Sequence, residues 1–117
     1  MDIKEFYQTI GGNYDAAKSR MLSDARIEKY LTKFSSYVNM GSLKNAMESK
    51  NYSEIFEITH NMKGMCLNLE LTPLAKSSSE LCEAVRHGEP NVEIAPLFDA
   101  ISSDYEKVVT AISRFIV

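Results

Sequence analysis

Residues 51–69 read NYSEIFEITHNMKGMCLNL, and this stretch decides the fold. Its apolar residues recur at intervals of three and four positions, which is the spacing of one face of an α-helix. Asn51 can cap the amino end of such a helix, and Glu54 stands three residues later, where a carboxylate can complete the cap. We therefore predict a long helix that begins at Asn51 and runs to about Glu70.

His60 points away from the apolar face of this predicted helix. At about 100° per residue, the apolar side chains lie roughly 140° to 240° from His60. They are Ile55, Ile58, Met62, Met65, Cys66 and Leu69. A lone histidine is often either a core residue or an accident of the surface, and the core interpretation fails because the interior must lie on the opposite side. We expect His60 to be exposed near the middle of the helix.

The rest of the chain repeats the helical spacing and shows no strand-like alternation. Ser23 and Thr72 are predicted N-caps, with Pro73 at the first helical position after Thr72 and Gly88 at the end of that helix. The predicted helices outside residues 51–70 cover residues 3–10, 14–21, 23–38, 41–47, 72–88 and 91–116. This pattern predicts an all-α fold, an antiparallel four-helix bundle with additional short N-terminal helices, as a single domain over residues 1–117.

The composition argues against several classes of protein. The 117 residues carry a net charge of −3 without a basic cluster, so nucleic acid is not an expected partner. No apolar stretch approaches the roughly 18 residues that span a bilayer. The N-terminus lacks the basic and apolar regions of a signal peptide, so we expect a cytoplasmic monomer without membrane contact. Cys66 and Cys82 lie in apolar helical stripes and are expected to be reduced core residues.

The residues around His60 indicate a chemical role for it. Lys63 and Gly64 stand three and four positions later, on the next turn of the same face. A glycine inside a helix costs about 1 kcal/mol relative to alanine, but it lets another molecule approach the imidazole. The lysine offers a cation for phosphoryl oxygens. Phe56 and Leu67 share this outward sector, which makes the face a candidate docking surface.

The run at residues 60–69, H-N-M-K-G-M-C-L-N-L, resembles the H-x-L-K-G-x-x-x-N-[LI] signature of histidine phosphotransfer domains. The resemblance continues through N-Y-S-E-I-F-E-I-T-H and L-T-P-L-A-K-S-S-S-E-L on either side, and includes the N-terminal F-Y-Q-T-I-G-G-N-Y. It implies that His60 accepts the phosphoryl group, that Lys63 lies near the phosphoryl oxygens and that Gly64 opens access. Met62 replaces the usual leucine, a conservative change on the core face, and Glu70 stands where the family commonly has glycine.

The same resemblance implies a function and partners. The chain would carry a phosphoryl group in a two-component phosphorelay, from the aspartyl phosphate of one receiver domain to the aspartate of another. It would be a phosphocarrier and not an enzyme, since no nucleotide-binding motif is present. Response-regulator receiver domains or a hybrid histidine kinase would dock over Phe56, Glu57, Leu67 and Asn68. We expect no cofactor or metal on this chain, with Mg²⁺ held by the receiver domain.

The residues alone leave two other functions open. A helical adaptor could bind a receiver or kinase domain without being phosphorylated, although the intact His60, Lys63 and Gly64 argue against it. A metal-assisted hydrolase is weakened because the chain has only two histidines, on different predicted helices. The second, His87, is expected in the last turn of its helix beside Gly88, where it can interact with the helix dipole.

Overall fold

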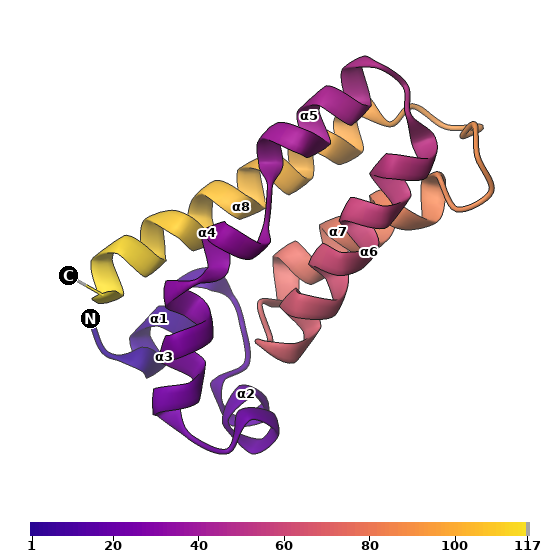
Figure 1. Cartoon of the computed structure of the whole chain (residues 1–117). Coiled ribbons are helices and arrows are strands. Elements are labelled where there is room, and N and C mark those ends of the chain that lie inside the picture. The colour runs from indigo at the N-terminus through magenta and orange to yellow at the C-terminus, as the bar shows by residue number, and fades with distance from the viewer. Residues whose placement is uncertain (117) are drawn as a thin grey trace.

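A computed structural model describes residues 1–116, and no β-strand occurs among them (Figure 1). Val117, the last residue of the predicted domain, and the side chain of Ile116 lie outside the described residues. The predicted all-helical fold is confirmed. The helices are α1 (Ile3–Ile10), α2 (Tyr14–Met21), α3 (Asp24–Thr32), α4 (Phe34–Tyr37), α5 (Met40–Glu48), α6 (Tyr52–Asn68), α7 (Thr72–Ala84) and α8 (Ala95–Ile116). Within residues 1–116, none has both the length and the hydropathy that crossing a bilayer requires.

Helices α6 and α7 form an antiparallel hairpin, and α7 packs against α8, the long helix that runs the length of the molecule (Figure 1). Helix α5 packs against α6, so that α5 to α8 build the helical bundle. The N-terminal helices α1 and α3 pack against α8, and α2 contacts α6. Helix α6 is thus held by neighbours on its inner side and by the N-terminal segment near its carboxyl end.

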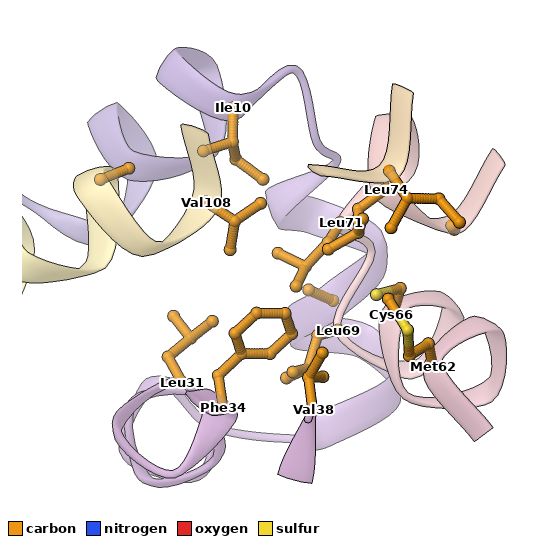
Figure 2. Close-up of a cluster of buried hydrophobic side chains, with 14 of the residues drawn as sticks. Ile10, Leu31, Phe34, Val38, Met62, Cys66, Leu69, Leu71, Leu74 and Val108 are labelled. Carbon is orange, nitrogen blue, oxygen red and sulfur yellow. The ribbon is translucent and has the colours of Figure 1, made fainter. Parts of the chain in front are cut away.

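The core joins apolar side chains from all parts of the chain (Figure 2). Met62 and Cys66 of α6 lie beside Leu74 of α7, with Leu69 and Leu71 of the connecting turn next to them. Residues from four other helices and one loop complete the cluster: Ile10, Leu31, Phe34, Val38 and Val108. Burial of this apolar surface is the main stabilising contribution to the bundle.

The helix predicted over residues 23–38 is interrupted, which corrects the prediction. Ser23 caps α3 as expected, but the helix ends at Thr32 and Lys33 links it to the short α4. No glycine or proline marks the break. Instead, the Thr32 hydroxyl donates a hydrogen bond to the Glu28 carbonyl at 2.7 Å. Side-chain bonding of this kind in the last turn competes with the backbone pattern and bends helices.

Three predicted helix boundaries also differ. The N-cap of α7 is Leu71, whose side chain is fully buried, and Thr72 is the first helical residue. Helix α7 ends at Ala84, and the chain turns before Gly88, which has φ +99°. Helix α8 begins at Ala95 and not near residue 91. An earlier start would place the ring of Pro96 inside the helix, where it would collide with the preceding turn.

Candidate functional site

His60 lies at the middle of α6, on the side that faces away from the core. The helix begins after Asn51, whose side-chain oxygen accepts a hydrogen bond from the Glu54 amide at 3.2 Å. Behind the histidine, the inward-facing residues are almost fully buried: Ile55, Thr59, Met62, Cys66 and Leu69. His60 itself is exposed, as the helical spacing predicts. The helix therefore presents the imidazole to an approaching molecule.

Gly64 leaves open space one turn beyond His60. A β-carbon placed on this residue would meet no atom of another helix and no side chain beyond its chain neighbours within 4 Å, so helix packing does not explain the glycine. Gly12 contrasts with it, because a β-carbon there would collide with the Glu70 carbonyl oxygen and the Tyr7 ring. Gly64 thus occupies a position where the structure tolerates a side chain and only an external partner would be obstructed.

Lys63 lies beside His60 on the flank that turns toward α7. Its side chain is partly buried, and within residues 1–116 it makes no ion pair. The ammonium group is near enough to the Glu83 carboxylate to contribute to the lowered pKa of that acid. A lysine without a close carboxylate partner can turn its ammonium toward an incoming anion.

Phe56, one turn before His60 on the same helix, restricts the orientation of the imidazole. The rings of Phe56 and His60 are stacked, with centroids 5.7 Å apart and an angle of 19° between the planes. Stacked aromatic rings attract each other and restrict side-chain rotation. The sequence places Phe56 on this face, and the structure adds that it touches the histidine.

Arg86 and Glu83 extend this cluster, although their sequence pattern did not mark them as site residues. The Arg86 guanidinium carbon lies 5.4 Å from the centroid of the Phe56 ring. Arg86 also pairs with Glu83 through two contacts, Nε to Oε2 at 3.0 Å and Nη2 to Oε1 at 2.5 Å. The hydrogen bonds from Arg86 are the main reason why the pKa of Glu83 is lowered, and its charge, Lys63 and His87 add to the effect. A cation is therefore held beside the ring that stacks on His60.

The other predicted docking residues surround the histidine on the surface. Glu57, Leu67 and Asn68 are exposed, and Leu67 keeps 48% of its surface accessible. A groove lies on each side of this exposed face of α6. One, of about 340 Å³, lies between α6 and α7 and includes Lys63 and Leu67. The other, of about 500 Å³, lies between α6 and helices α2 to α4; Asn68 is part of its wall.

The remaining candidate groups do not gather at this site. Among residues 1–116, no three metal-binding side chains lie close enough together to hold an ion. His87 is exposed in the turn after α7, so the expectation that it belongs to the last turn of the helix is wrong. Cys66 and Cys82 are free and buried. Burial raises the pKa of the Cys66 thiol to about 12, which keeps it protonated and unreactive.

Comparison with known proteins shows one family model that matches the chain. The model described as the Hpt domain matches residues 33–111, which is more than half of the chain. The match includes His60, Lys63 and Gly64 and spans α4 to α7 with most of α8, whereas α1 to α3 precede it. No curated protein and no solved structure matches the chain significantly.

Proposed function

Since the chain belongs to the Hpt domain family, whose members carry phosphoryl groups in two-component signalling, we propose that it is a phosphorelay carrier that is phosphorylated on His60. The observation that supports this most strongly is the exposure of His60 opposite the core, next to the open space at Gly64. Both features are expected if another protein must reach the imidazole. A purely structural histidine would need neither.

The proposed chemistry is a direct phosphoryl transfer. A neutral ring nitrogen of His60 attacks the phosphorus of an aspartyl phosphate on a receiver domain. A P–N bond forms while the P–O bond to the aspartate breaks, and the aspartate leaves as a carboxylate with the electron pair of that bond. The second ring nitrogen keeps its proton. In the following transfer, the carboxylate of another receiver attacks the phosphorus, the P–N bond breaks and neutral imidazole is restored.

Neighbouring residues would assist by charge, access and orientation. Lys63 would bring its ammonium to the phosphoryl oxygens, where charge develops in the transition state. Gly64 would leave room for the receiver's acidic site to approach, and Phe56 would hold the imidazole in one orientation through the observed stack. Such positioning lowers the entropic part of the barrier. Mg²⁺, which this chemistry requires, would be bound by the receiver domain.

Receiver domains are the proposed partners, either free response regulators or the receiver of a hybrid histidine kinase. Members of this family act with such domains. On this chain the contact surface would surround His60 and include Phe56, Glu57, Leu67 and Asn68. Its apolar part consists of Phe56 and the exposed Leu67, one turn before and two turns after the histidine. This combination gives the receiver an apolar contact next to a cationic reaction centre.

The test is incubation of the full chain with receiver domains that have been phosphorylated by acetyl phosphate in the presence of Mg²⁺. We expect one phosphoryl group per chain by intact mass, labile in acid and stable in base. The His60→Gln variant should take up none, and His87→Gln should behave like the wild type. A wild-type chain that binds a receiver but is never phosphorylated would support the adaptor function instead. Equal labelling of His60→Gln would identify another acceptor.

A further inference from the structure

The carboxyl end of α6 is held by an arginine from a different helix. Arg20 of α2 donates a hydrogen bond to the Leu67 carbonyl oxygen. The same guanidinium pairs with the Glu70 carboxylate through Nη2 and Oε1, 2.9 Å apart. The Leu67 carbonyl also accepts a hydrogen bond from the Glu70 amide at 3.2 Å. The charge of Arg20 stabilises the negative end of the helix dipole. Helix α6 has no basic residue of its own in its last turn, so Arg20 supplies the missing charge.

Glu70 adds a charge that Arg20 balances at this end of the helix, where Tyr7 and Asn13 also donate hydrogen bonds to backbone carbonyls. An acidic side chain is unfavourable at the negative end of a helix dipole. Glu70 also has φ +54°, a left-handed backbone conformation that costs free energy for a residue with a side chain. Its side chain is only 20% exposed. Arg20 compensates the charge of Glu70 and links the turn to α2 at the same time.

The two helices that Arg20 connects both line the larger groove beside the site. Met21, the residue after Arg20, lines the groove from α2, while Met65 and Asn68 line it from α6. Tyr30, Tyr37 and Leu69 also line it, and both tyrosines are exposed. Leu67 follows on the outer side of α6, toward Gly64 and His60. The groove is therefore next to the surface over which the receiver is proposed to dock.

We propose that Arg20 is a positioning residue for receiver docking, because it fixes the α2 and α6 sides of this groove and Leu67 in one arrangement relative to His60. The inference rests on the proposed phosphorelay function. It assigns a role in partner binding to the N-terminal segment, which lies outside residues 33–111. Arg20 does not touch the reacting atoms, so its loss should weaken docking and leave the chemical step intact.

The experiment compares the wild type, Arg20→Gln, Glu70→Gly and the double variant. Each full chain is melted and then titrated against a receiver phosphorylated by acetyl phosphate. For Arg20→Gln we expect a lower melting temperature and an increase of about fivefold in the chain concentration that gives half-maximal transfer. The maximal rate should be unchanged. In the double variant, glycine at position 70 removes the unpaired carboxylate and adopts the left-handed backbone without strain, so the melting temperature should recover. The chain concentration that gives half-maximal transfer should stay raised.

Two controls accompany these variants. Lys18→Gln removes another cation of α2, one that pairs with Asp24 at 3.6 Å, and should transfer like the wild type. Arg20→Lys should restore part of the docking, because lysine carries the charge but cannot engage the carbonyl and the carboxylate with a planar fork.

Several outcomes would overturn the inference. One is an Arg20→Gln chain with the wild-type concentration dependence, and another is a lower maximal rate at unchanged half-maximal concentration. If both the melting temperature and the half-maximal concentration return to wild-type values in the double variant, Arg20 acts through stability alone. In all three cases the wild type is phosphorylated and the proposed function stands. A wild-type chain that accepts no phosphoryl group overturns both.

Discussion

The imidazole of His60 and the ring of Phe56 are stacked, with 5.7 Å between centroids and 19° between planes. The stack matters because the histidine is otherwise exposed and could rotate freely. Arg86, 5.4 Å from the Phe56 centroid, adds a cation to the same cluster from the turn after α7. The orientation of the proposed phosphoryl acceptor thus depends on contacts from its own helix and from a neighbouring segment. Four predictions follow from this site and from the core behind it.

Replacing Phe56 by leucine should slow phosphotransfer while the chain remains folded. Leucine keeps an apolar side chain but removes the stack, which is worth about 0.5–1.5 kcal/mol for an aromatic pair. If that energy orients the imidazole in the transition state, the maximal rate falls by about two- to tenfold. Time courses at saturating receiver measure this. Tyr105→Leu is the matched control, since it breaks the Phe34–Tyr105 stack without touching His60 and should leave the rate unchanged.

Replacing Gly64 by alanine should stabilise the chain and slow transfer. Alanine loses less backbone freedom on folding, and the open space accepts its methyl group, so stability should rise by up to about 1 kcal/mol. A melting temperature about 3–6 °C higher is expected. Gly64→Gln should slow transfer further without unfolding the chain. As a contrast, Gly12→Ala should lower the melting temperature, because its β-carbon has no room. Variants of Gly64 that melt lower but transfer normally would assign this glycine to packing.

Replacing Ser78 by alanine should raise stability. The Ser78 hydroxyl is fully buried in α7 and has no hydrogen-bond partner among the described residues. Removing a buried polar group without a partner eliminates its desolvation cost, about 1 kcal/mol. Ser77→Ala is the control, because the Ser77 hydroxyl donates to the Leu74 carbonyl at 3.3 Å and its loss should bring no such gain. Thermal melts of both variants decide the point, and a lower melting temperature for Ser78→Ala would contradict it.

Stability should fall as the pH rises from about 9 to about 12. Burial raises the pKa of the Cys66 thiol to about 12, whereas in the unfolded chain the thiol ionises near its ordinary value. The native state therefore holds the thiol proton more tightly than the unfolded state does. The resulting contribution to the free energy of unfolding is complete below the pKa of the unfolded thiol. Once the unfolded thiol ionises, stability is lost at about 1.4 kcal/mol per pH unit. Burial raises the pKa of Tyr7 too, with the charge of Glu70 as a second cause, so it acts in the same direction.

Chemical denaturation of the wild type and Cys66→Ala across this pH range measures the effect. The variant should be less stable at neutral pH because of the cavity it creates. Its stability should nevertheless decline less steeply with pH. Tyr7, Tyr14 and Tyr105, whose pKa values are also raised in the folded chain, account for part of the remaining slope. Parallel slopes for the two proteins would show that Cys66 does not contribute.

Local periodicity was sufficient to predict the helical fold and the direction of His60. Side chains three and four residues apart lie on one face of a helix, so the apolar residues of α6 determine its buried side and, by exclusion, its exposed side. The same rule placed Phe56, Lys63, Gly64 and Leu67 near the histidine. Boundaries were less well predicted: the break at Lys33 and the N-cap at Leu71 depend on side-chain bonding and on burial in the assembled core.

The amino-acid sequence by itself therefore determined which residues share the outer face of α6, because that relationship is set within one helix. Only the tertiary structure decided which distant residues support that face. Arg86 reaches Phe56 from the turn after α7, and Arg20 binds the Leu67 carbonyl from a position 47 residues away in the chain. No helical spacing encodes such pairs. They form because the packing of the apolar faces brings α2, α6 and α7 together, and the polar groups at their edges then find partners.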